Sequence, residues 1–491
     1  MALAIVRDTF ADGDYARFTE RCVTQLEALG RITANPAFGE GPATLGAELE
    51  LPLVAPDGRP APVNRALIAA VDDPRLTVEI ARYNLELNLT PVPAAGRPFR
   101  AMGDEIGALL DALRRHGEPL GAAPLPVGIL PSIARADTTS EAMTDLPRYR
   151  ALEAAVRRLR RGPARLVVRG RETLDVEDDG VMLEGANTSF QVHLRVPAGR
   201  YADTYNAAQL ATPVAVALGA NSPIFLGRTL WDETRIVVFK QSVDMRTDDE
   251  LAWHRPARVA FGHGWVRHGI HELFAESVRL HPPIFPVSGE GAPVDAHDPP
   301  GLAELRLHQG TVWRWNRAVY DPGDGGHLRI EFRALPSGPT VRDMMANAAW
   351  ILGLTMGMRD GIEERLCGCP FLMCDTSFYR AARDGLDARL LWPTRAGPAP
   401  RERDVVELAE KLLPVAADGL RRLGVDDDEA GELLAVIAGR LAARRTGARW
   451  QRAALLRLRE TVAEAQVLPT LVREYAARAA TGEPVHTWSA L

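Results

Sequence analysis

The chain has 491 residues and a formal net charge of −6, with 46% hydrophobic and 25% charged residues. This composition is typical of a soluble globular protein and excludes collagen, coiled coils and wholesale disorder. The slightly acidic balance gives no support for nucleic-acid binding, which favours a basic surface. Lys240 and Lys411 are the only lysines, so lysine-based chemistry has two candidates at most.

The N-terminal segment and the cysteines favour a cytoplasmic protein without membrane contact. The apolar run at 1–6 is too short for a secretion signal, and no stretch reaches the ~18 apolar residues of a membrane span. Cys22 stands alone, whereas Cys367, Cys369 and Cys374 form a C-x-C-x4-C cluster whose spacing fits no common zinc site. We expect reduced, structural thiols, with a metal or redox role as the alternative.

Hydrophobic periodicity predicts the secondary structure along the chain. In the first half of the chain, we expect a helix at 13–32, strands at 44–54 and 83–92, helices at 100–116 and 147–161, strands at 170–183 and 187–197, and a buried helix at 206–223. A strand at 235–244, a loop at 281–301 and a strand pair at 311–320 and 327–335 should follow. From 341 onward we expect helices, which should include nearly all of 401–480.

These elements predict an α+β fold. We expect a helical lead-in at 1–40, a large body at 41–395 dominated by antiparallel strands, and a helical extension at 396–491 packed on that body. Strands and helices do not alternate as βαβ units, which excludes a doubly wound parallel sheet. The sequence contains no P-loop and no Gly-x-Gly-x-x-Gly after a strand, so a nucleotide would be bound in another way.

Acidic residues inside apolar strands are the most informative feature. Glu48 and Glu50 are two residues apart in a strand, so both side chains project from the same face. Three further segments carry polar residues in or beside predicted strands. Glu79 and Glu86 are seven residues apart, and Glu86 lies within a strand. Ser189, Gln191 and His193 share one face of their strand, and Glu331 and Arg333 share one face of theirs.

Two interpretations fit this pattern. An antiparallel sheet often has one solvated face, where such residues simply meet water. However, carboxylates on neighbouring strands repel one another unless a cation joins them. A set of carboxylates with one imidazole suits Mg²⁺ or Mn²⁺, ions that commonly work with nucleotide phosphates, and Arg333 could then meet phosphoryl charge.

Other clusters are weaker. His263, His268 and His271 lie close in sequence, and the last two share a helix face, but no acidic or cysteine partner stands at a usual metal spacing. Trp313, Trp315 and Arg317 share one face of a predicted strand and could wall a pocket or pack ordinarily.

The polar motifs resemble those of bacterial glutamate–cysteine ligases and carboxylate–amine ligases, which have a glutamine synthetase-like fold of a curved antiparallel sheet with helices on its outer face. Six motifs occur in family order between about residues 44 and 350. They are Gly46-x-Glu48-x-Glu50, Glu79 with Glu86 and Thr90-Pro91, Arg148-Tyr149, Asn187-x-Ser189-x-Gln191-Val192-His193, Ala220-Asn221-Ser222-Pro223 with Gly227-Arg228, and Glu331-x-Arg333.

The sequence also departs from the family pattern. Thr90-Pro91 stands one residue later than usual. The segment after Pro223 reads TLWDETRIVVF, where Trp231 and Asp232 replace the family's tyrosine region and only Arg235 survives clearly. Because this segment contacts substrate in the family, the acceptor amine is left open.

The resemblance implies an ATP-dependent ligase that forms an amide, typically a γ-glutamyl amide, through an acyl phosphate, with ATP and Mg²⁺ or Mn²⁺ bound. Its partners would be amino acids or amines, without nucleic acid or membrane, in a possible homo-oligomer. The implied catalytic residues are Arg333, Glu331 and Glu48, the substrate-binding residues Arg235, Asn187 and Gln191, and the metal ligands Glu48, Glu50, Glu79, Glu86, His193 and Glu331. The alternatives are a non-catalytic metal- and nucleotide-binding protein and a guanidino-kinase-like phosphotransferase.

Overall fold

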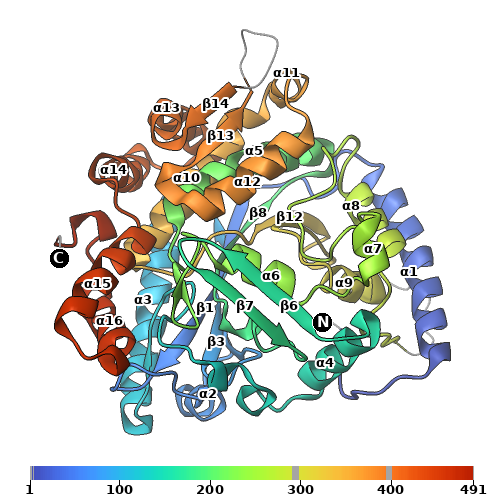
Figure 1. The fold of residues 1–491 in the computed structure, drawn as a ribbon. Helices are drawn as coiled ribbons and strands as arrows, with labels where there is room; N and C mark the ends of the chain where they lie inside the picture. The colour runs from blue at the N-terminus through green and yellow to red at the C-terminus, as the bar shows by residue number, and fades with distance from the viewer. Residues whose placement is uncertain (1–2, 4, 290–297, 394–400, 490–491) are drawn as a thin grey trace.

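An eight-stranded antiparallel sheet runs through the molecule (Figure 1). Its main path has the order β11–β12–β8–β1–β3–β2, and the short strands β4 and β5 pair with β1. The computed structural model describes residues 3, 5–289, 298–393 and 401–489. The strands are β1 (Thr44–Val54), β2 (Leu76–Val78), β3 (Asn84–Asn88), β4 (Val92–Pro93), β5 (Ala123–Pro124), β8 (Phe190–Arg195), β11 (Asn316–Asp321) and β12 (His327–Phe332).

The two faces of this sheet differ in chemistry because side chains alternate along each strand. In β1, Leu45, Ala47 and Leu49 are buried, whereas Glu48 and Glu50 point to the other face and are partly exposed. The apolar residues join one large core that also takes in helices α5 (Tyr201–Gly219) and α10 (Val341–Arg359). One face is therefore packed, and the opposite face is free to hold polar groups.

Helices α5 and α10 are buried on nearly all sides. Tyr201 and Tyr205 of α5 donate hydrogen bonds to backbone carbonyls of β12 and β11, which ties this helix to the sheet. A further helical layer lies outside them, formed by α12 (Phe371–Asp384) and α13 (Val405–Leu423) (Figure 1). The buried helix predicted at 206–223 is confirmed and begins earlier, at Tyr201.

Glycines allow α10 and α13 to cross at very short range. A β-carbon added at Gly419 of α13 would lie 1.8 Å from the carbonyl oxygen of Gly353 in α10. One at Gly357 would lie 2.1 Å from the carbonyl oxygen of Val415. Backbone contacts backbone at this crossing, and no larger side chain fits between the helices.

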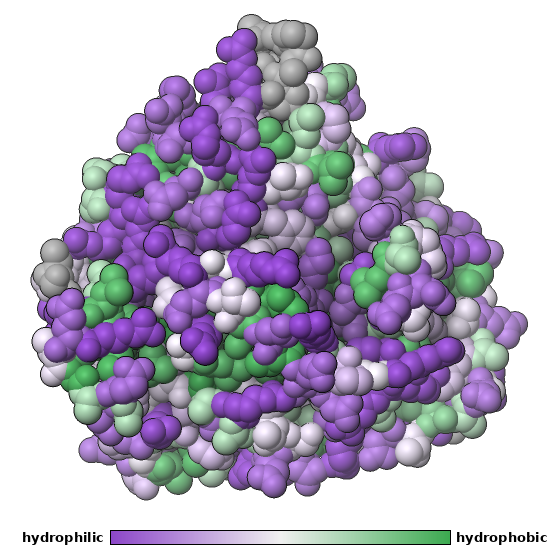
Figure 2. Space-filling model, viewed as in Figure 1, coloured by the Kyte–Doolittle hydropathy of each residue, from purple (hydrophilic) through white to green (hydrophobic). Residues whose placement is uncertain are grey.

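The other helices surround this framework. Hydrophilic and hydrophobic residues are mixed over the face of the molecule seen in Figure 2. No helix among the described residues is long and apolar enough to cross a bilayer. The helices are α1 (Asp12–Thr33), α2 (Asn64–Val71), α3 (Pro98–Gly117), α4 (Pro147–Arg160), α7 (Asp248–Ala252), α8 (Ile270–Leu280), α9 (Ala303–Gln309), α11 (Ile362–Leu366), α14 (Asp427–Ala443), α15 (Gly447–Thr461) and α16 (Glu464–Ala479).

One predicted strand is wrong. Residues 235–244 form helix α6 (Arg235–Ser242), in which Arg235 and the four residues after it are all buried. A short, wholly buried apolar run looks the same in a strand and in a helix, so periodicity could not separate the two.

Several boundaries also differ. The strand predicted at 170–183 is limited to β7 (Thr173–Asp178), and its hairpin partner β6 (Ala164–Arg169) was not predicted. Strand β11 begins only at Asn316, so Trp313 and Trp315 precede it. The segment 401–480 opens with β14 (Arg401–Asp404), which pairs with β13 (Arg389–Trp392). Of the predicted loop, 290–297 lies outside the described residues.

Two glycine-to-alanine substitutions test the helix crossing. Gly419→Ala should destabilise the protein by about 1–3 kcal/mol or more, because the added methyl forces α10 and α13 apart. Gly431→Ala is the matched control, since Gly431 lies exposed in α14 with nothing near its β-carbon position. It should stabilise the protein by about 0.5–1 kcal/mol through helix propensity. Urea unfolding measures both changes, and equal effects would contradict the crossing geometry.

Candidate functional site

The polar face of the sheet brings the predicted residues into neighbouring rows. Antiparallel pairing places residues of β12, β8, β1 and β3 side by side, because directly opposite side chains on one face are close neighbours. The register pairs Glu331 with His193, His193 with Gly46, Glu48 with Gln191, and Glu50 with Glu86.

The first cluster joins three adjacent strands. Glu48 of β1, His193 of β8 and Glu331 of β12 offer ligand atoms that lie within 4.8 Å of one another. The Nε2 atom of His193 lies 3.4 Å from a carboxylate oxygen of Glu48. That nitrogen is buried and has no hydrogen-bond partner in the described structure, so it is left available to a ligand.

The second cluster consists of carboxylates alone. Glu50 of β1, Glu79 just after β2, and Glu86 of β3 likewise offer oxygens within 4.8 Å of one another. Glu86 accepts hydrogen bonds from Thr77 (3.1 Å) and Asn88 (2.8 Å). None of the three forms an ion pair within 4.0 Å in the described part of the chain.

Arg333 and Gln191 connect the two clusters. Arg333 donates to the carboxylate of Glu331 and, at 2.6 Å, to the amide oxygen of Gln191. Gln191 in turn donates to Glu50 at 2.8 Å. Glu50 also accepts from the backbone N–H and the hydroxyl of Ser189, at 2.8 and 2.9 Å. This chain of hydrogen bonds fixes the Arg333 guanidinium between the clusters.

The two clusters differ in charge. Burial alone would raise the pKa of Glu331, but Arg317 and Arg333 together hold that pKa below its usual range. In the second cluster, burial and the nearby charges of Glu48 and Glu50 raise the pKa of Glu86 to about 7. Burial, then Glu86 and Glu50, raise the pKa of Glu79 well above its usual value. In the second cluster, the positive charges of Arg148, acting on Glu79, and of Arg333, acting on Glu50, do not offset the effect of burial.

These residues fit divalent cations. Three mutually repelling carboxylates, none with an ion pair within 4.0 Å in the described structure, favour a hard cation that takes oxygen ligands, such as Mg²⁺ or Mn²⁺. The orphaned Nε2 of His193 beside two carboxylates offers a second, mixed site. The chemistry of both donor sets thus agrees with the predicted metal ligands Glu48, Glu50, Glu79, Glu86, His193 and Glu331.

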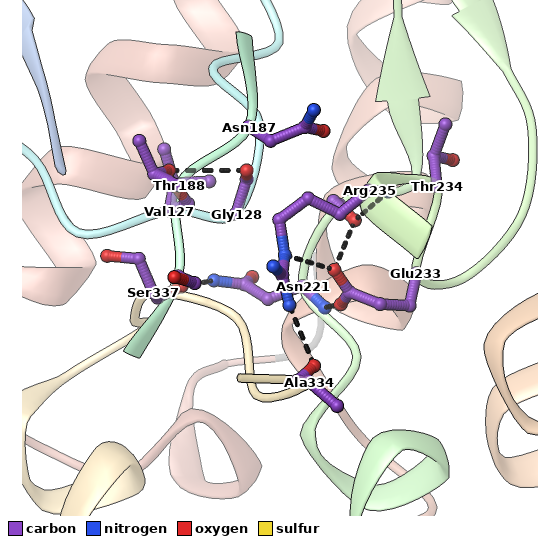
Figure 3. Close-up of polar contacts among 12 residues, drawn as sticks. Val127, Gly128, Asn187, Thr188, Asn221, Glu233, Thr234, Arg235, Ala334 and Ser337 are labelled. Atoms are coloured by element: carbon purple, nitrogen blue, oxygen red, sulfur yellow. Dashed lines mark hydrogen bonds and ion pairs between the residues drawn. The ribbon is translucent and has the colours of Figure 1, made fainter. Parts of the chain in front are cut away.

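Figure 3 shows the surroundings of the predicted substrate residues Arg235 and Asn187. Arg235 is 3% exposed, and its guanidinium donates to Glu233 at 3.0 Å and to the carbonyl of Ala334 at 2.7 Å. Asn187 donates to the carbonyl of Glu184, and its amide oxygen is buried without a partner in the described structure. Two of the three guanidinium nitrogens of Arg235 therefore already donate to protein groups.

Asn221, from the Ala-Asn-Ser-Pro motif, is buried and forms hydrogen bonds that hold neighbouring segments together. Its amide donates to the carbonyl of Ser337 and to the hydroxyl of Tyr475 in α16, both at 2.8 Å. Gln451 of α15 donates to the amide oxygen of Asn221 at 2.9 Å. This buried amide connects the C-terminal helices to the loop behind the site.

Two residues of the site have roles that the sequence did not reveal: Arg317 was considered only as a possible pocket wall, and Glu184 was not considered. Arg317 donates to Glu331 through Nε at 2.7 Å and lies opposite it across the β11–β12 pair. That strand pair was predicted, but only its register reveals the ion pair. Glu184, in a 3₁₀ turn before Asn187, lies near Glu50, and burial raises its pKa to about 8. No sequence signal marked Glu184.

The weaker clusters do not form metal sites among the residues that the structure describes. The groups able to hold an ion include neither His263, His268 and His271 nor the cysteines. All four cysteines are free thiols; Cys367 is exposed, and Cys22, Cys369 and Cys374 are buried. Burial raises the pKa of the buried thiols, so those three are protonated at neutral pH.

The comparison with known proteins decides the family. The model of glutamate-cysteine ligase family 2 (GCS2) matches residues 44–465. The chain belongs to this family. The predicted resemblance, carried by motifs between about 44 and 350, is thus confirmed and extends further toward the C-terminus.

One relative of the GCS2 chain matches it over only part of both sequences. A protein of Frankia casuarinae named "Putative glutamate--cysteine ligase 2-1" is 30% identical over 172 residues, which cover 32% of this chain and 43% of that relative. The chain thus matches less than half of the relative's length.

Two solved structures are similar to the GCS2 chain, and the first of them supports its fold. The glutamate–cysteine ligase of Francisella tularensis in complex with AMP is similar with a TM-score of 0.54 at 12% identity, over 90% of each chain. A bifunctional glutathione synthetase of Pasteurella multocida has a TM-score of 0.49 at 11% identity, over 93% of this chain and 53% of its own. The first likeness confirms the predicted glutamine synthetase-like α+β fold.

The raised pKa values predict how stability depends on pH. Because Glu86 has a higher pKa in the folded than in the unfolded chain, the folded state holds its proton more tightly. Without divalent ions, stability should therefore fall as pH rises from about 4.5 through about 7. Added Mg²⁺ should restore it most at the high end of this range, where the carboxylates are ionised.

Melting temperatures in EDTA and in Mg²⁺, measured from pH 5.5 to 8.5, check this expectation. Glu86→Gln should flatten the pH dependence in EDTA and reduce the Mg²⁺ effect, whereas Glu177→Gln, at an exposed position on β7, should change neither. A Mg²⁺ effect that is independent of pH and of Glu86 would contradict the prediction.

Proposed function

We propose that the protein is an ATP-dependent carboxylate–amine ligase that forms a γ-glutamyl amide through an acyl phosphate. The observation that carries the proposal is the pair of metal-type clusters connected by the Arg333–Gln191–Glu50 hydrogen bonds. Membership of the glutamate-cysteine ligase family supports it. The substrate carboxylate attacks the γ-phosphorus of ATP, ADP leaves, and the amine then displaces phosphate from the acyl carbon.

The residues divide the work of phosphoryl transfer, which consists mainly of positioning and charge neutralisation. Divalent ions, when held by the two carboxylate clusters, would neutralise phosphate charge. Arg333 would stabilise the transferring phosphoryl group, and its contacts with Glu331 and Gln191 hold it ready without reorganisation. Arg317 keeps Glu331 ionised and in place from the other side.

Arg235 and Asn187 would act near the substrate. Glu233 and the carbonyl of Ala334 already accept hydrogen bonds from two nitrogens of Arg235. We therefore propose that Arg235 contributes positive charge beside the substrate and does not bind a substrate carboxylate in a bidentate manner. The unpartnered amide oxygen of Asn187 is free to accept from the substrate, for example from an ammonium group.

A coupled assay tests the ligase activity. The protein, ATP and Mg²⁺ are incubated with glutamate and a panel of amino acids and amines, and phosphate release is measured alongside mass-spectrometric detection of amides. Glu331→Gln should abolish both signals, and the exposed Glu177→Gln should retain them. Hydroxylamine should trap the acyl phosphate as a hydroxamate in the absence of amine. If ATP is bound but no acid and amine pair releases phosphate, the ligase proposal fails.

The role of Arg333 makes a separate prediction. Arg333→Lys should lower kcat by about 10³, because lysine cannot keep the contacts with Glu331 and Gln191 and also reach the phosphoryl group. The KM for ATP should change much less, since the lost contact forms mainly in the transition state. Arg473→Lys, on an exposed turn of α16, is the control and should leave both constants unchanged. A loss confined to KM would argue against phosphoryl stabilisation.

A further inference from the structure

Two adjoining cavities lie outside the two metal-type clusters. One has a volume of about 340 Å³ and the other about 1200 Å³. They share the wall made by Arg161, at the end of α4, and the segment 244–247 after α6. The larger cavity also reaches the outward face of β6 and Trp231, within the segment that departs from the family pattern. None of these residues belongs to the proposed ligase machinery.

The larger cavity contains Lys240, one of only two lysines in the chain. Its ammonium donates to the hydroxyl of Tyr379 at 2.7 Å and lies 4.2 Å from the centre of the same ring. Lys240 forms no ion pair within 4.0 Å in the described structure, although the charges of Asp375 and Asp244 act on it. Burial lowers the pKa of Lys240, so its charge is poorly compensated.

The smaller cavity contains a second cation without an acidic partner. Arg258 is 6% exposed and donates only to neutral oxygens in the described structure, those of Thr311 and the carbonyl of Pro282. Burial lowers its pKa to about 9. His281 lines the same cavity, is 5% exposed, and has a buried Nε2 atom without a hydrogen-bond partner among the described residues. Buried charges are normally paired, so this arrangement is incomplete without an anion.

The linings of the two cavities carry more positive than negative side chains. The two linings together hold seven arginines and one lysine against three aspartates and one glutamate. Two of those acids are already paired within the wall, Asp244 with Arg246 and Glu250 with Arg255. Exposed Arg161, one of the seven arginines, lies at the junction of the cavities and lines both. The net positive charge thus converges on both cavities.

We propose that the two cavities form a binding site for a small, multiply charged anion bearing phosphate or carboxylate groups, held by Lys240 on one side and Arg258 with His281 on the other. Ammonium and guanidinium groups form strong charge-assisted hydrogen bonds with such oxygens. Trp231 and Tyr379 provide aromatic surface for the body of the ligand in the larger cavity. The site stands apart from the ligase proposal and would remain if that proposal failed.

The scarcity of lysine makes a direct test possible. The intact protein in EDTA is treated briefly with an amine-acylating ester, and acylation of Lys240 and Lys411 is quantified by peptide mass spectrometry. Inorganic pyrophosphate and citrate are the probes, with sodium chloride at matched ionic strength. Either probe should slow acylation of Lys240 by about tenfold or more, the effect of one charge-assisted contact, and leave exposed Lys411 unchanged. The more protective probe identifies phosphate or carboxylate as the preferred group.

Thermal unfolding with the same probes separates this site from the catalytic face. Pyrophosphate should raise the melting temperature of the wild type, Lys411→Gln and Arg333→Lys alike. The rise should disappear in Lys240→Gln and Arg258→Gln. Should Arg258→Gln fail to fold, Arg161→Gly replaces it, because Arg161 is exposed and has a positive φ of 62° that glycine adopts easily. Equal protection of both lysines, or a shift lost in Arg333→Lys but kept in Lys240→Gln, would overturn the proposal.

Discussion

The buried carboxylate of Glu331, held between Arg317 and Arg333, is the interaction on which the candidate site depends. An ionised carboxylate without solvent exposure is tolerated only when it is paired and hydrogen-bonded. Here both partners come from the same antiparallel pair, one from β11 and one from just beyond β12. The contact with Glu331 orients Arg333 toward Gln191, which in turn donates a hydrogen bond to Glu50. Thus one ion network sets the geometry of two clusters on different strands.

The sheet register explains why this network coexists with a stable core. Each strand presents apolar residues to α5 and α10, and the alternate residues form the polar rows. A shift of one residue in any strand would bury carboxylates under helices and expose leucines, so the core itself enforces the register. Stability and function are therefore encoded in the same strands but on opposite faces.

The sequence alone could predict the polar rows, because a period of two places Glu48 with Glu50 and Glu331 with Arg333 whatever the partners. It could not predict which rows meet, since strand order and register depend on long-range packing. For this reason the ion pair of Arg317 with Glu331 and the position of Glu184 were not predicted, and Arg235 was expected to bind substrate before its contact with Glu233 was known. Helix α6 was mistaken for a strand because burial on all sides erases periodicity. Elements with one exposed face, such as α1 and α3, were located well.

The contact between Asn221 and Tyr475 has a consequence for how the protein is made. During translation, the strands that carry the clusters emerge first, yet the loop behind them gains its last hydrogen-bond partners from α15 and α16. The loop behind the charged rows therefore lacks its hydrogen bonds to Gln451 and Tyr475 until more than two hundred residues after Asn221 have been synthesised. Completion of this part of the fold is thus a late, long-range event.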